Sequence, residues 1–162
     1  MAKIILGIDP GIADTGFGII KEDGGRLSCL ACGSIKTPST AALSVRLEML
    51  YLKLDKLIKD YRPDLAAVEE LFFNKNVRTA LIVGQARGVA LLTLKQNGLP
   101  LVEYTPSQVK QAVAAYGQAS KKQIQKMVMM ILGLKEIPKP DDAADALALA
   151  ICALNSRLCR KS

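Results

Sequence analysis

The hydrophobic pattern of the chain changes its period after residue 36, and this change limits the folds that the chain can adopt. Before that point, three strand-like segments follow one another through short connections: residues 3–9, 16–22 and 27–36. The connection at residues 22–26 contains Gly24 and Gly25, which is typical of a hairpin. Short connections of this kind favour an antiparallel meander.

From residue 42 onward, helix-like and strand-like segments alternate. Leucines recur at helical spacing through 42–61, and a second long helix is predicted at 76–97. Strands are predicted at 65–69 and 99–104, each after one of these helices. Thr105 and Ser120 are typical N-caps of two short helices, and a last helix is predicted over about 142–157.

These elements predict an α/β fold with a five-stranded mixed sheet and helices on both faces. Parallel neighbouring strands need a crossover, and the two long helices supply it. The strand at 3–9 should be central, beside the strand at 65–69. The chain has 162 residues, no internal repeat and no linker rich in Gly or Ser. We therefore expect a single domain over residues 1–157, followed by a short basic tail at 158–162.

The chain is basic, with 22 Lys and Arg against 15 Asp and Glu, a formal net charge of +7. A positive surface attracts phosphate backbones or anionic membranes, although solubility alone is the simpler interpretation. We find no apolar segment long enough to span a membrane, and the run before Asp9 is too short for a signal peptide. We therefore expect a cytoplasmic protein.

Cys29 and Cys32 form a CxxC pair, a spacing that can indicate a zinc or redox site. Against zinc, the chain has no His, and Cys152 and Cys159 do not form a second close pair. Residues three apart in a regular strand point to opposite faces, which is poor geometry for chelation. We therefore expect the cysteines to pack as apolar side chains.

Four carboxylates occupy positions that a metal-dependent nuclease would need. Asp9 and Glu69 each close an apolar run, and Asp142 and Asp145 share one face at the start of the last predicted helix. Carboxylates that converge at the end of buried strands repel one another, and divalent cations relieve this repulsion. Two Mg²⁺ ions roughly 4 Å apart could activate water and stabilise the leaving oxygen. Helix capping alone is the simpler interpretation of Asp141, but it explains Asp145 less well.

Four short motifs follow one another along the chain: residues 7–11 (GIDPG), 68–72 (VEELF), 84–90 (GQARGVA) and 142–148 (DAADALA). In series, they resemble those of the RuvC family of bacterial Holliday-junction endonucleases. The resemblance implies an RNase H-like fold and a homodimer that binds four-way DNA junctions during homologous recombination and DNA repair. It also implies paired, symmetric Mg²⁺-dependent nicks that leave 5′-phosphate ends, with Mn²⁺ able to substitute, and a branch-migration complex with RuvA and RuvB.

The same resemblance implies roles for individual residues. Phe72 matches an aromatic residue placed against junction bases, with Phe73 as the competing candidate and a core phenylalanine as the simpler interpretation. Lys110 and Lys121 match basic positions near the scissile phosphate, and Arg78 and Arg87 are further phosphate candidates. The implied catalytic and metal-binding set is Asp9, Glu69, Asp142 and Asp145.

Three other functions compete with this interpretation. A nuclease of the same fold, similar to the YqgF branch, would cut single strands or RNA rather than junctions. An actin-like ATPase or a sugar-kinase half would bind ATP, but such enzymes need two domains of this kind. A noncatalytic junction-binding protein would lack one of the four acids, whereas all four are present here.

Overall fold

The first three strands form the predicted antiparallel meander. They are β1 (Lys3–Asp9), β2 (Asp14–Asp23) and β3 (Arg26–Lys36), and β2 pairs with both neighbours. Gly24 and Gly25 form the turn between β2 and β3 with positive φ angles, a conformation that glycine adopts at low cost. The structure is a computed structural model, and it describes residues 1–71 and 76–158.

The remaining strands join the sheet through helical crossovers, as the sequence predicted. Helix α1 (Leu43–Tyr61) leads to β4 (Leu65–Glu69), and α2 (Val77–Gln96) leads to β5 (Leu101–Tyr104). Both β4 and β5 run parallel to β1, which gives the strand order β3-β2-β1-β4-β5. The mixed five-stranded sheet and the central place of β1 beside β4 are therefore confirmed.

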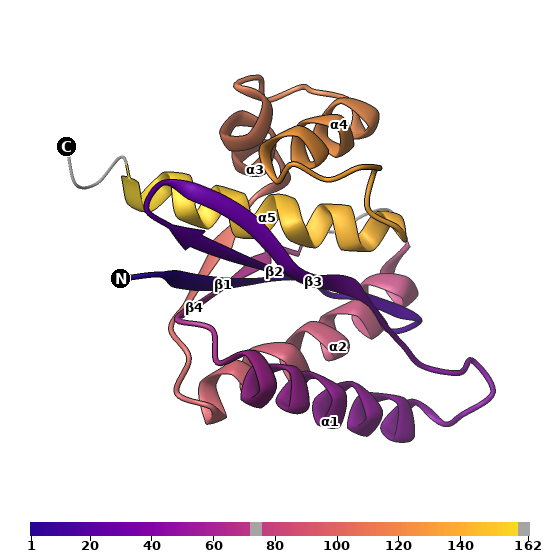
Figure 1. Ribbon diagram of the computed structural model, residues 1–162. Coiled ribbons are helices and arrows are strands. Elements are labelled where there is room, and N and C mark those ends of the chain that lie inside the picture. The colour runs from indigo at the N-terminus through magenta and orange to yellow at the C-terminus, as the bar shows by residue number, and fades with distance from the viewer. Residues whose placement is uncertain (72–75, 159–162) are drawn as a thin grey trace.

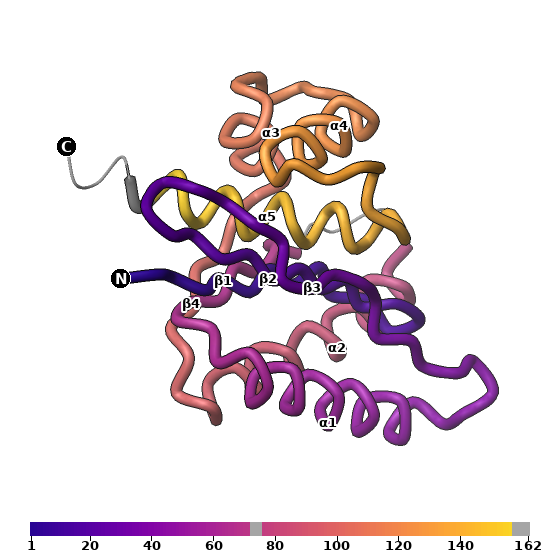
Figure 2. Tube along the Cα trace, in the orientation of Figure 1, coloured from indigo at the N-terminus to yellow at the C-terminus, as the bar shows by residue number. Residues whose placement is uncertain are grey.

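Helices cover both faces of the sheet (Figure 1). Helices α1 and α2 lie on one face, and α5 (Asp141–Leu158) lies on the other. The short helices α3 (Pro106–Ala114) and α4 (Lys121–Ile131) pack on the outer side of α5. The chain trace in Figure 2 shows the sheet enclosed between these layers. Thr105 and Ser120 form the predicted capping boxes of α3 and α4.

The cysteine pair does not follow the regular strand pattern that the sequence analysis assumed. Ile19 pairs with Ala31 but Ile20 pairs with Cys29, so β3 carries a bulge at Leu30. A bulge of one residue reverses the alternation of side chains. Cys29 and Cys32 consequently pack against the same hydrophobic cluster, on the α5 face. The prediction of opposite faces was wrong. The prediction of apolar packing is confirmed for Cys29, Cys32 and Cys152, while Cys159 lies outside the described residues.

Helix α2 corrects a second expectation. An 18-residue window within it has a mean hydropathy of 1.3, so the helix is long and apolar enough by composition to cross a membrane. One such helix is weak evidence for a membrane span. Its exposed apolar side chains are Val77, Leu81 and Leu92, and they form a stripe along one side of the helix. The predicted absence of any such segment was wrong on length and composition.

Candidate metal centre and junction-binding surface

Asp9 and Glu69 lie side by side at one edge of the sheet. Strands β1 and β4 run parallel, and Ile8 is the register partner of Val68, so the next residue on each strand is an acid. The two carboxylates are close enough that the charge of Glu69 raises the pKa of Asp9. The parallel crossover predicted from the sequence therefore brings these two carboxylates together.

Two glycines let α5 approach the sheet closely enough to complete the acidic cluster. A Cβ atom at Gly7 would collide with the backbone carbonyl of Ala146, and one at Gly16 with the backbone of Asp142. The helix backbone therefore lies directly on β1 and β2. This contact places Asp142 and Asp145 over Asp9, and one oxygen from each of the three lies within 4.8 Å of the others.

Burial and mutual repulsion disfavour the ionised form of the carboxylates in this cluster. Burial is the largest cause that raises the pKa of Asp9, and the neighbouring carboxylates of Glu69, Asp145 and Asp142 contribute in that order, so that the pKa reaches about 8. Burial also raises the pKa values of Glu69, Asp142 and Asp145. Lys121 acts in the opposite direction on all four acids. A cation bound here would replace both the lost hydration and the missing counter-charge.

The donor set suits a hard divalent cation. Asp9, Asp142 and Asp145 offer only carboxylate oxygens, which are the ligands of Mg²⁺, Mn²⁺ and Ca²⁺ rather than of softer metals. Glu69 lies at the side of this group, next to Asp9. The residues therefore fit a metal centre built around Asp9.

Two lysines face the same site from the α3 and α4 side. The Lys121 Nζ atom lies 3.3 Å from Oδ2 of Asp145 and 3.4 Å from Oδ2 of Asp141. Lys110 and Lys121 line one cavity of about 260 Å³ together with Glu69 and Asp145. The structure thus brings both predicted lysines to the acidic cluster. Gln125, which is buried, donates a hydrogen bond to Asp141 over 3.1 Å.

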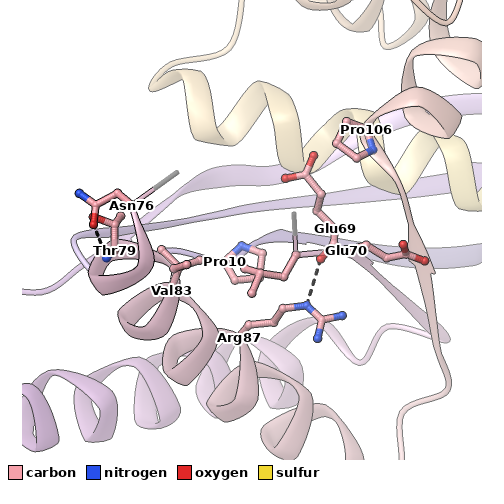
Figure 3. A pocket seen from close by; sticks show the side chains of 10 residues that line it. Pro10, Glu69, Glu70, Asn76, Thr79, Val83, Arg87 and Pro106 are labelled. Carbon is pink, nitrogen blue, oxygen red and sulfur yellow. Dashed lines mark hydrogen bonds between the residues drawn. The ribbon is translucent and has the colours of Figure 1, made fainter. Parts of the chain in front are cut away.

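The other residues predicted to contact DNA differ in their exposure to solvent. Arg78 is exposed in the first turn of α2. Arg87 is largely buried, pairs with Glu103 and donates a hydrogen bond to the backbone carbonyl of Glu69. Phe72 and Phe73 lie outside the described residues. A second cavity, of about 470 Å³, opens between Glu69, Pro10 and the first turns of α2 (Figure 3).

Sequence reasoning missed three features of the site. They are the glycine contacts beneath α5, the Gln125–Asp141–Lys121 chain of contacts, and the Arg87–Glu103 pair. A signal for the first was present, because Gly7, Gly16 and Gly18 interrupt strands that are otherwise rich in apolar side chains. Glycine inside a strand often marks a close backbone approach.

Comparison with known proteins assigns the chain to a family. The family model described as crossover junction endodeoxyribonuclease RuvC matches residues 5–153. The chain belongs to the RuvC family. A curated member from Heliobacterium modesticaldum, a crossover junction endodeoxyribonuclease RuvC, is 57% identical over 153 residues, which are 94% of each chain. The family resemblance found in the sequence is therefore confirmed.

Solved RuvC structures share the fold across the whole chain. The structure of Thermus thermophilus RuvC matches with a TM-score of 0.87 and 36% identity over 96% of both chains. The same protein in complex with a Holliday junction substrate matches with a TM-score of 0.87 and 35% identity, again over 96% of both chains. The α/β architecture with its five-stranded mixed sheet is thus that of RuvC and of RNase H-like proteins.

Proposed function

We propose that this RuvC-family chain is a Holliday junction resolvase, a metal-dependent endonuclease that makes paired, symmetric nicks in four-way DNA junctions during recombination and repair. The observation that carries the proposal is the convergence of Asp9, Asp142 and Asp145 with Glu69 at one sheet edge. Membership of the family and similarity to a RuvC bound to a Holliday junction support it. Hydrolysis would leave 5′-phosphate ends.

Asp9, Glu69, Asp142 and Asp145 are the residues that would hold the metal. Asp9 interacts with all three of the other acids, so it is the residue around which Mg²⁺ or Mn²⁺ would be held. Such ions supply a nucleophilic hydroxide and stabilise charge on the leaving oxygen. The four acids would orient the bound cations. Their negative charge would repel a substrate phosphate unless bound cations compensate that charge.

Lys110 and Lys121 would orient the scissile phosphate. Both line the cavity that contains Glu69 and Asp145, so a phosphate bound at the acidic cluster lies within reach of both ammonium groups. Lys121 is now paired with Asp145 and Asp141 and would exchange these partners for phosphate. Arg78, exposed on α2, would contact the DNA backbone further out, and Phe72 would stack on junction bases.

We further propose that the exposed stripe of α2 forms the homodimer interface. Val77, Leu81 and Leu92 are 70%, 63% and 55% exposed. A Cβ at Gly88 would meet nothing within 4 Å, so this glycine leaves open space that a second backbone could enter. Exposed apolar patches of this kind mark interaction sites. Two copies joined here would present two acidic clusters to the two strands that a resolvase cuts.

Two further expectations stay predictions. Assembly with a RuvA and RuvB branch-migration complex rests on family resemblance, and the cytoplasmic location rests on the sequence analysis.

The proposal is tested by cleavage of a synthetic mobile four-way junction, with linear duplex, single-stranded DNA and an RNA–DNA hybrid as controls, in Mg²⁺ and in EDTA. A resolvase cuts the junction at paired positions, only with metal, and far faster than any control. Equal cutting of the controls would indicate a general nuclease. Tight junction binding without cleavage in any metal would indicate a noncatalytic binding protein.

A further inference from the structure

Arg87 is held in an unusual position for a DNA contact. It projects from α2 toward the end of β4, where its Nε atom donates a hydrogen bond to the backbone carbonyl of Glu69 over 3.2 Å (Figure 3). Its guanidinium also pairs with the carboxylate of Glu103 on β5. The Arg87 side chain is only 17% exposed. Its charge is therefore compensated within the protein rather than presented to solvent.

The two partners of Arg87 belong to neighbouring strands. Val68 is the register partner of Glu103, and Glu69 is the partner of Tyr104, in the parallel pairing of β4 with β5. The pairing continues one residue further, because the backbone N–H of Glu70 donates to the carbonyl of Tyr104 over 2.9 Å. The Arg87 guanidinium thus connects the ends of β4 and β5 to α2, through the backbone of Glu69 and the side chain of Glu103.

Glu69 needs such support because its neighbours repel it. Its carboxylate lies beside Asp9, and the negative charge of Asp145 raises its pKa. Mutual repulsion of this kind favours a displaced backbone whenever the strand end is free to move. Metal ligands must be held within about 0.5 Å of the productive geometry, which requires that their supporting groups be fixed.

We propose that Arg87, together with Glu103, is a positioning residue that fixes the backbone of Glu69 and thereby the metal centre. The inference rests on the proposed role of Glu69 as a metal ligand. It assigns Arg87 a function different from the phosphate contact that its charge suggests. The planar guanidinium holds a carbonyl and a carboxylate in a fixed relative geometry, which the freely rotating ammonium of lysine does not impose.

The test compares Arg87→Gln and Arg87→Lys with Glu103→Gln and the double variant Arg87→Gln/Glu103→Gln. Mn²⁺ affinity is measured by calorimetry without DNA, and junction cleavage is measured under single-turnover conditions. We expect Arg87→Gln to weaken Mn²⁺ binding about threefold or more and to slow cleavage about tenfold. Glu103→Gln, which keeps the arginine charge, should act in the same direction, and the double variant should be little worse than Arg87→Gln.

Arg78→Gln is the matched control, because it removes the same charge from an exposed position of the same helix. We expect it to weaken junction binding and to lower the salt slope of binding by about one, without changing Mn²⁺ affinity. For Arg87→Gln, the expected change in the salt slope is close to zero.

Two results would overturn the proposal. One is a lower salt slope for Arg87→Gln with unchanged Mn²⁺ affinity, which would make Arg87 a phosphate contact. The other is unchanged Mn²⁺ affinity in folded Glu103→Gln and Arg87→Lys proteins, which keep a cation at position 87 and so remain informative if Arg87→Gln fails to fold. Failure of the wild-type chain to cut junctions would contradict the proposed function alone, since the calorimetry needs no DNA.

Discussion

At the scale of single residues, the acids and the lysines of the site come from different elements. The acids lie at the sheet edge and at the start of α5, while Lys110 and Lys121 come from α3 and α4 on the other side of the shared cavity. Residue type and position in the sequence were enough to predict the four acids. They did not predict that Lys121 is paired with Asp141 and Asp145, because that contact depends on how α4 packs on α5.

Asp9 gives the metal-free protein a specific dependence on pH. Its pKa is raised from 3.8 to about 8 in the folded state, so the folded protein holds a proton that the unfolded chain releases. The free energy of unfolding should therefore fall as pH rises from about 4 to about 8. Asp9→Asn has no carboxyl at this position, so its free energy of unfolding should not show this part of the fall with pH. In EDTA at about pH 8 it should unfold with a free energy higher than wild type by about 1–3 kcal/mol.

Thermal unfolding at several pH values checks this expectation, with Asp23→Asn as an exposed control. The difference between Asp9→Asn and wild type should be near zero at about pH 4 and grow toward pH 8. Mg²⁺ should reverse the order at the higher pH by stabilising the wild type. A difference that does not change with pH would contradict the raised pKa.

Lys110 is expected to contact phosphate in the bound complex. Lys110→Ala should weaken junction binding and reduce the slope of log K against log salt by about one. Lys56→Ala removes the same charge from α1, on the opposite face of the sheet, and should leave the slope unchanged. Binding titrations at several salt concentrations measure both. An unchanged slope for Lys110→Ala would place this lysine away from the DNA.

At the scale of elements, the position of α5 on the sheet determines whether the site exists. Gly7 and Gly16 permit backbone contact between the helix and the central strands. Gly7→Ala should force α5 away and destabilise the fold by about 1–3 kcal/mol, the usual cost of overpacking. Because Asp142 and Asp145 move with the helix, cleavage and Mn²⁺ affinity should fall as well.

Denaturant unfolding and Mn²⁺ calorimetry of Gly7→Ala test this, with Gly84→Ala as the control. A Cβ at Gly84 would make only an ordinary 3.8 Å contact with Leu71, and alanine favours helix, so this control should be at least as stable as wild type. A Gly7→Ala protein with normal stability and normal metal affinity would show that α5 can shift without loss.

Helix α2 supplies the second element-scale expectation. Leu81→Glu should convert the dimer to a monomer, because it places a charge in the apolar stripe, while the monomer stays folded. Leu52→Glu changes a leucine of similar exposure on α1, 57% against 63%, and should leave the dimer intact. Sedimentation measures the mass of each variant, and circular dichroism checks the fold. A dimer that persists in Leu81→Glu would exclude the stripe as the interface.

At the scale of the whole molecule, most of the architecture could be predicted because it follows from local pattern. The change of hydrophobic period fixed the order of strands and helices, and the need for crossovers placed β1 beside β4. The bulge at Leu30, the Arg87–Glu103 pair and the exposure of α2 were not predictable in this way. Each depends on how different elements pack against one another, which periodicity within one element does not report.

The whole chain also separates affinity from chemistry. Its net charge of +7 favours DNA, while three partly buried acids are gathered at one site. Binding should therefore survive changes that abolish cleavage.

The most direct measurement is junction affinity and junction cleavage on one preparation of Asp9→Asn, in Mg²⁺. We expect no detectable cleavage and an affinity within about twofold of wild type, because the substitution removes a proposed metal ligand but no proposed phosphate contact. Cleavage at the wild-type rate would contradict the metal centre. Loss of affinity together with cleavage would show that Asp9 has a structural rather than a chemical role.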